Sequence, residues 1–133
     1  MNLKLVFYAE VLINTITLLL CFFSPGKFIE QLVTVDYNLF AAELARWYGL
    51  VLLLLSGIML TALRQKTFHF LRIVLLINLP GDIIQVALTV HTAHVFNRWT
   101  AGLIFTIVVC TLLFVTRVAV LKKPGLAGYE NAG

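Results

Sequence analysis

Four long apolar segments constrain this chain more than any other feature of its sequence. They cover about residues 4–23, 44–63, 68–90 and 99–121, and each is long enough to cross roughly 30 Å of hydrocarbon as a helix. A segment inside a bilayer must satisfy its backbone hydrogen bonds internally, which favours α-helices. We therefore expect an all-α, polytopic membrane protein, built as an antiparallel bundle of four transmembrane helices with a flexible tail at 124–133.

The composition agrees with this class of protein. Of the 133 residues, 61% are hydrophobic and only 12% are charged, and the mean hydropathy of +0.98 is far above that of an ordinary soluble domain. The first segment differs from a cleaved signal peptide, because Glu10 and Asn14 interrupt its apolar run. We expect it to be retained, so that residues 1–133 form a single transmembrane domain in contact with the lipid bilayer.

Positive charges are divided unequally between the two ends of the expected bundle. One end holds seven of the Lys and Arg residues: Lys4, Arg64, Lys66, Arg72, Arg117, Lys122 and Lys123. The other end holds three: Lys27, Arg46 and Arg98. The positive-inside rule therefore predicts that both termini are cytoplasmic. Because these charges are scattered at helix ends rather than clustered, we expect no nucleic-acid partner.

The third apolar segment carries an acidic residue near its centre. Asn78, Asp82, Gln85 and Thr89 fall at i, i+4, i+7 and i+11, which places them on one face of a helix. An ionised carboxylate is costly in hydrocarbon, so such residues usually face the interior of a bundle and mark a proton, ion or substrate path. Asp82 is therefore one candidate catalytic residue.

The first segment has a similar arrangement, with Glu10 and Asn14 at i and i+4. Counted at 1.5 Å per residue from the nearest basic residue of each helix, Glu10 and Asn78 lie about 9 Å deep, and Asn14 and Asp82 lie about 15 Å deep. We expect the first and third segments to touch there, enclosing a polar pocket in which each acid lies beside an amide of the other helix. Hydrogen bonds to amides would lower the cost of burying the two acids. Glu10 is the second candidate catalytic residue.

Other polar and aromatic residues could bind substrate or support the two acids: Asn14, Asn78, Gln85, Arg46, Glu43, Trp47 and Tyr48. Arg46 could turn inward toward Gln85 and stabilise an ionised Asp82. Glu43 and Arg46 at i and i+3 equally fit an ordinary interfacial ion pair, and Trp47 and Tyr48 fit an aromatic belt. A purely structural network of hydrogen bonds between helices is the alternative for all the buried polar residues.

The sequence predicts no metal site, disulfide or cofactor. His91 and His94 have the spacing of metal ligands, but the sequence offers no third ligand near them. Cys21 and Cys110 lie at depths that differ by about 9 Å, which is too far for a disulfide.

The connection after the first segment has its own pattern. Apolar pairs within residues 28–33 predict a short helix lying in the membrane interface. Asp36 or Asn38 could cap the helix that follows.

The two halves of the chain also resemble each other weakly. Each half contains an acid with a nearby amide: Glu10 with Asn14 in the first half, and Asp82 with Gln85 in the second. In both halves an Arg-Trp pair then opens the next segment. This order suggests a parallel repeat about an axis along the membrane normal, as in some transporters. Interfacial anchoring alone would also explain the Arg-Trp pairs.

Three family resemblances accompany these patterns. Ala9-Glu10-Val11 followed by Phe23-Ser24-Pro25-Gly26 resembles the first helix and turn of small multidrug-resistance transporters, which implies exchange of protons for cationic drugs through Glu10. Ser24-Pro25-Gly26-Lys27-Phe28, Ala45-Arg46-Trp47-Tyr48-Gly49 and the stretch 78–82 resemble small DoxX-like four-helix proteins, whose functions are mostly unassigned. The paired membrane carboxylates are similar in chemistry to the small transmembrane cyclases and hydrolases of fungal secondary metabolism, which implies a role in biosynthesis.

These patterns favour a membrane-embedded enzyme that acts on a lipophilic small molecule. One protonated carboxyl would serve as general acid and one ionised carboxylate as base. Epoxide opening or hydrolysis, isomerisation and cyclisation all use such a pair and need no cofactor. Two alternatives remain at this point: a proton-coupled transporter, which we expect to be a homodimer, and a structural or accessory membrane subunit.

Overall fold

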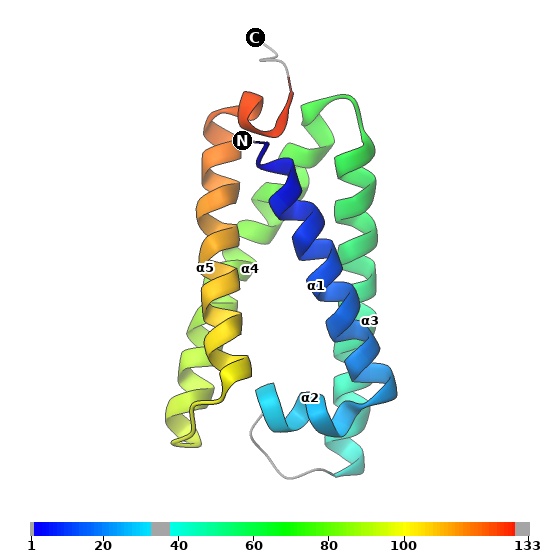
Figure 1. The fold of residues 1–133 in the computed structure, drawn as a ribbon, viewed down its shortest axis with the longest axis vertical. Helices are drawn as coiled ribbons and strands as arrows, with labels where there is room; N and C mark the ends of the chain where they lie inside the picture. Colours follow the sequence, from blue (N-terminus) through cyan, green and yellow to red (C-terminus); the bar gives the residue numbers. More distant parts are fainter. Residues whose placement is uncertain (1, 33–37, 130–133) are drawn as a thin grey trace.

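The computed structural model describes residues 2–32 and 38–129, and no β-strand occurs among them (Figure 1). Four of its helices are long and apolar enough to cross a membrane, which confirms the predicted four-helix membrane bundle. The elements in chain order are α1 (Lys4–Phe23), α2 (Pro25–Leu32), α3 (Leu39–Arg64), α4 (Phe68–Val95), α5 (Ala101–Lys122) and the 3₁₀ helix η1 (Pro124–Ala127).

Two of the helices are longer than the apolar segments that predicted them. α3 begins at Leu39 rather than near residue 44, because the side chain of Asn38 accepts a hydrogen bond from the backbone N–H of Ala41 at 2.7 Å. Asn38 is thus confirmed as a cap, whereas Asp36 lies outside the described residues. α4 continues to Val95 rather than ending near residue 90.

The membrane helices pack as two antiparallel pairs (Figure 1). α1 lies along α3, and α4 lies along α5, while α4 slopes away from α3 after the short turn that joins them. We expected α1 and α4 to touch, but their main packing partners are α3 and α5. One reason is Gly49 on α3, where an added Cβ would lie only 3.0 Å from the Cβ of Cys21 on α1. The missing side chain lets these two helices approach closely.

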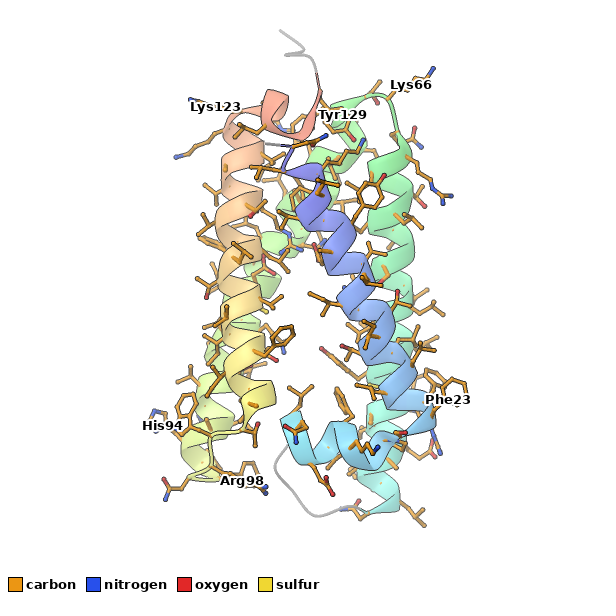
Figure 2. All side chains as sticks on the ribbon, viewed as in Figure 1. Phe23, Lys66, His94, Arg98, Lys123 and Tyr129 are labelled. Carbon is orange, nitrogen blue, oxygen red and sulfur yellow. The ribbon has the colours of Figure 1, made fainter. Side chains whose placement is uncertain are left out.

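The two ends of the bundle are built differently. The start of α1, the α3–α4 turn and η1 lie at one end, which we call the terminus end; α2 and the α4–α5 turn lie at the other, the α2 end (Figure 1). Lys66 and Lys123 lie at the terminus end, and His94 and Arg98 lie at the α2 end (Figure 2). Apolar side chains close the bundle at the terminus end, including Phe7, Met59, Leu63, Leu71, Leu75 and Val120.

Two short segments complete these ends. α2 forms where a short helix was predicted, beginning at Pro25, and it buries Phe28 and Ile29 against the α1–α3 pair. The tail expected to be flexible from residue 124 is instead ordered through residue 129: it forms η1 and then buries Tyr129 beside Phe68, with ring centroids 5.5 Å apart. Apolar contact of the Tyr129 ring with the core explains this difference. Residues 130–133 lie outside the described part.

Candidate functional site

Three charged side chains meet inside the bundle, and we call them the charged cluster. Arg117 of α5 donates through Nη1 to Oδ2 of Asp82 on α4, and through Nη2 to Oε1 of Glu10 on α1 at 2.5 Å. The exposed fractions of the side chains are 2% for Arg117, 11% for Glu10 and 10% for Asp82. Asp82 is therefore buried and Glu10 is largely buried, and one guanidinium joins the two predicted catalytic acids.

The charged cluster corrects the partners predicted for the two acids. We expected Glu10 beside Asn78 and Asn14 beside Asp82, but neither acid bonds to an amide side chain in the part of the chain that the structure describes. Asn14 and Asn78 are half-buried on their helices. A guanidinium supplies charge as well as hydrogen bonds, so it offsets the burial of two carboxylates more effectively than amides would.

Arg117 is the member of the charged cluster that the sequence analysis did not identify as a site residue. We counted it among the charges at a helix end, because it lies only five residues before the end of α5. That position is about 7.5 Å deep, close to the depth of about 9 Å for Glu10. Arg117 also continues the mildly polar face of α5 at i+11 from Thr106 and i+7 from Cys110. The depth of Arg117 in the membrane and its position on the polar face of α5 together could have indicated that it faces the acids.

The charged cluster has two acids and one base. With both carboxyls ionised it carries one net negative charge, and with one carboxyl protonated it is neutral. Oε2 of Glu10 and Nε of Arg117 are buried, and neither has a hydrogen-bond partner among the described residues. Glu10 therefore has one oxygen bonded to Arg117 and one buried oxygen without a partner among the described residues, which can take a proton.

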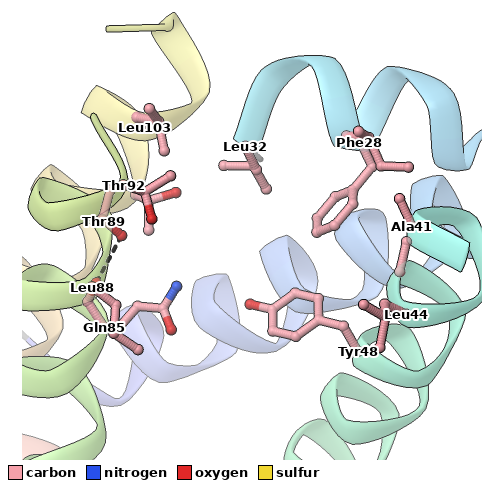
Figure 3. A pocket seen from close by; sticks show the side chains of 13 residues that line it. Phe28, Leu32, Ala41, Leu44, Tyr48, Gln85, Leu88, Thr89, Thr92 and Leu103 are labelled. Atoms are coloured by element: carbon pink, nitrogen blue, oxygen red, sulfur yellow. Dashed lines mark hydrogen bonds between the residues drawn. The ribbon is translucent and has the colours of Figure 1, made fainter. Parts of the chain in front are cut away.

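A cavity of about 320 Å³ lies at the α2 end, between the two helix pairs (Figure 3). Its volume falls within the range of about 300 to 1,000 Å³ that is usual for small-molecule sites. α2, α3, α4 and α5 line it, so the pocket is not enclosed by the first and third apolar segments as we expected. Most of the wall is apolar, and the polar contributions come from Tyr48, Gln85, Thr89, Thr92 and Thr106.

Tyr48 and Gln85 point toward each other across this cavity (Figure 3). The Tyr48 ring stacks on Phe28 of α2, with ring centroids 5.6 Å apart. On α4, the hydroxyl of Thr89 donates to the backbone carbonyl of Gln85 at 2.7 Å. Neither the Tyr48 hydroxyl nor the Gln85 side-chain amide bonds to another described residue. Both groups are therefore available to a ligand.

The cavity and the charged cluster are adjacent but distinct. No residue of the charged cluster is among the described residues that line the cavity, and Asp82 instead borders a smaller hollow of about 190 Å³ between α4 and α5. Gln85 connects the two regions, because it lies three residues beyond Asp82 on α4, about 4.5 Å along the helix axis. The predicted polar face of α4 thus runs from the charged cluster into the cavity.

Three of the predicted supporting residues lie on the exposed surface of α3, away from the charged cluster and the cavity. Arg46 pairs with Glu43, and their side chains are 44% and 58% exposed. Trp47 is also exposed. The structure therefore matches the alternative of an interfacial ion pair and belt residue, and the idea that Arg46 turns toward Gln85 is wrong. An arginine at this exposed position can remain hydrated, which favours the outward conformation.

The remaining candidate ligands for metals and disulfides are dispersed. Cys21 and Cys110 are free thiols, and His94 lies edge-on to Trp99 with ring centroids 6.1 Å apart. Within residues 2–32 and 38–129, no group of three His, Cys, Asp or Glu side chains is placed to hold a metal ion. A comparison with protein-family models, curated proteins and solved structures finds no match to this chain.

Proposed function

We propose that this protein is a membrane-embedded enzyme that transfers protons to and from a lipophilic small molecule bound in the cavity. The main support for this proposal is the geometry of the Glu10 carboxylate. Arg117 bonds to its Oε1, while the buried Oε2 has no hydrogen-bond partner among the described residues. An oriented carboxylate with one open oxygen is suited to general acid–base catalysis, which typically contributes about 10² to 10⁴ in rate.

The residues of the charged cluster divide this chemistry. Glu10 accepts a proton from the ligand or returns one to it, and Asp82 is the second carboxyl that can hold a proton. Arg117 is a positioning residue, because it fixes both acids and limits the net charge. Isomerisation, epoxide opening or hydrolysis, and cyclisation all begin with a proton transfer and need no cofactor. A ligand that extends past Gln85 toward the terminus end approaches these groups.

The proposal is tested by conversion of membrane lipids. Purified protein in lipid vesicles is incubated with a lipid extract, and the extract is compared by mass spectrometry before and after. We expect a lipophilic component to become a product of unchanged mass, or of a mass increased by one water. Glu10→Gln keeps the shape and removes the proton transfer, so its rate should fall by about 10² or more.

Glu43→Gln is the matched control, because Glu43 is an acid outside the charged cluster and should leave the rate unchanged. Thermal unfolding in detergent verifies that each variant is folded. A folded Glu10→Gln protein that converts the component at the wild-type rate would show that Glu10 is not the acid–base group.

Proton-coupled transport is the second candidate, and one observation favours it. The charged cluster joins α1, and through it the α1–α3 pair, to the α4–α5 pair. A proton on Glu10 would weaken that junction and allow the pairs to rearrange, as alternating access requires. Four helices rarely enclose a pathway alone, so this candidate includes a homodimer. Uptake of a lipophilic cation driven by a pH gradient, without chemical change and lost in Glu10→Gln, would favour transport over catalysis.

We also propose that the terminus end is cytoplasmic. The buried position of Arg117 removes it from the interfacial charges. That leaves six Lys and Arg residues at the terminus end against three at the α2 end. The bias is smaller than the sequence alone indicated, but the positive-inside rule still gives the same orientation.

A further inference from the structure

We propose that the cavity takes a neutral, lipophilic molecule with one hydrogen-bond-accepting oxygen, which the Tyr48 hydroxyl and the Gln85 amide hold between them. This inference deepens the proposed function, on which it rests, by naming the class of substrate. It follows from three properties of the cavity: its polar groups, its lack of charge and its volume.

The polar groups converge on one place. The Tyr48 hydroxyl and the Gln85 amide come from α3 and α4, on opposite walls, and face each other (Figure 3). A tyrosine hydroxyl and an amide NH₂ each donate a hydrogen bond, and a carbonyl or hydroxyl oxygen has lone pairs to accept both. A purely apolar ligand would leave both groups unpaired in an apolar cavity, which is unfavourable.

The lining carries no formal charge. No Lys, Arg, His, Asp or Glu is among the described residues that line the cavity. An ionised ligand would lose its hydration there without gaining a counter-ion. The wall around the Tyr48–Gln85 pair is apolar, with Phe28, Leu32 and Leu88 among its members. A neutral ligand with an apolar body fits this lining.

The volume sets the size of the ligand. A cavity of about 320 Å³ corresponds to roughly ten units of about 30 Å³, the share of liquid volume that one water occupies. We therefore expect about ten to twelve non-hydrogen atoms to be enclosed. A medium-chain ketone or alcohol has this size and the required single oxygen.

The fold holds the two donors in fixed positions. Phe28 of α2 stacks on Tyr48. The C-terminal end of α2 contacts the start of α5, where the hydroxyl of Thr100 donates a hydrogen bond to the backbone carbonyl of Gln31. α2 therefore connects the α1–α3 pair to the α4–α5 pair and fixes the distance that the ligand oxygen must bridge. Such preorganisation lowers the entropic cost of binding.

Binding of decan-2-one tests this inference, with decane and decanoate as matched probes. Occupancy of the full chain, released from detergent micelles, is measured by native mass spectrometry. We expect decan-2-one to bind about tenfold more tightly than decane or decanoate. Tyr48→Phe keeps the stacked ring and Gln85→Leu keeps the approximate volume, and each should weaken decan-2-one binding about five- to tenfold, as expected for one lost hydrogen bond.

Tyr8→Phe is the control, because Tyr8 is an exposed tyrosine of α1 that does not line the cavity. Decan-2-one affinity in this variant should equal that of the wild type. Equal binding of decane and decan-2-one, unchanged affinity in both cavity variants, or no binding of any probe would each overturn the inference. Because binding needs no turnover, Glu10→Gln should bind decan-2-one normally, which separates failure of this inference from failure of the proposed chemistry.

Discussion

Arg117 is the residue on which the two buried acids depend. Its guanidinium is almost fully buried and bonds to both Glu10 and Asp82. Replacing a complete buried ion pair by apolar residues is often neutral or stabilising, whereas removing one partner leaves an uncompensated charge and is costly. Stability alone therefore gives little reason for such a cluster in the middle of a membrane protein. The proposed role in proton transfer would give such a reason.

Gly102 of α5 allows the backbone of α2 to pack closely against α5. A Cβ at this position would lie 2.7 Å from the backbone carbonyl oxygen of Gln31, and backbone atoms cannot move without shifting α2. We expect Gly102→Ala to lower the free energy of unfolding by about 1 to 3 kcal/mol, as overpacking usually does. Unfolding of the purified protein in detergent measures this loss.

Gly57→Ala is the matched control for that substitution. Gly57 lies inside α3, and no heavy atom lies within 4 Å of a Cβ built there. Alanine favours a helix over glycine by roughly 0.5 to 1 kcal/mol, so this variant should be slightly more stable than the wild type. Equal stability of the Gly102→Ala and Gly57→Ala variants would contradict the close contact between α2 and α5.

At the residue scale, sequence reasoning identified the acids but not their partner. Asp82 and Glu10 are conspicuous because a carboxylate is rare within an apolar run. Arg117 is inconspicuous because a basic residue near a helix end usually marks the interface. The amides were chosen as partners on depth alone, and depth does not distinguish an amide from a guanidinium on a different helix.

At the element scale, the helices pair within each half of the chain. α1 packs along α3 in the first half, and α4 packs along α5 in the second. A parallel repeat, which the order of acids and Arg-Trp pairs suggested, would also pair the helices in this way. The two Arg-Trp pairs nevertheless differ in place, because Arg46 lies inside α3 whereas Arg98 precedes α5.

A disulfide tests the pairing of α1 with α3. A Cβ at Gly49 would lie 3.0 Å from the Cβ of Cys21, slightly closer than the usual separation of about 3.5 to 4.5 Å in disulfides. In a Cys110→Ser background, Gly49→Cys should therefore form a disulfide with Cys21 under mild oxidation. Loss of two alkylatable thiols in mass spectrometry measures it.

Gly57→Cys in the same background provides the comparison, because nothing lies within 4 Å of a Cβ at this position of α3. We expect both of its thiols to remain alkylatable. If the thiol at position 49 also stays fully alkylatable after oxidation, α1 does not lie along α3.

The sequence predicted the elements better than their neighbours. The four membrane spans could be predicted because long apolar segments are visible in the sequence. Asn38 could be predicted as the cap of α3 because capping depends on the chemistry of neighbouring residues. Neighbours are harder to predict in a membrane, because lipid-facing and protein-facing surfaces are both apolar. The close approach at Gly49 depends on the shape of two helices at once, which periodicity does not show.

At the scale of the whole molecule, one end is closed and the other holds the cavity. Apolar side chains and η1 close the terminus end, and α2 lies between the helix pairs and contacts both at the α2 end. The charged cluster and the cavity lie next to each other along α4. The proposed substrate would therefore occupy the cavity with one end directed toward the acids.

The four-span arrangement predicts which positions are accessible from each side. Single cysteines in a cysteine-free background at Lys66 and Lys123 should react with a membrane-impermeant reagent from one side. Cysteines at Gln31 and His94 should react from the opposite side. The charge bias predicts that Lys66 and Lys123 face the cytoplasm. Labelling of Lys66 and Lys123 from opposite sides would refute four membrane spans.

The proposed chemistry depends on the contact between Glu10 and Arg117, and a double-mutant cycle measures the strength of this contact. The cycle is carried out in an Asp82→Asn background, so that one acid faces one base. The free energy of unfolding in detergent is measured for Glu10→Gln, for Arg117→Gln and for both together. Buried charge pairs couple by about 1.5 kcal/mol or more, so we expect at least that value.

The same cycle between Glu10 and Asn78 distinguishes the structure from the arrangement that depth alone predicted. Residues that do not interact usually give coupling energies within about 0.5 kcal/mol of zero, which we expect for this pair. A Glu10–Arg117 coupling near zero together with a large Glu10–Asn78 coupling would contradict the charged cluster and the function proposed for it.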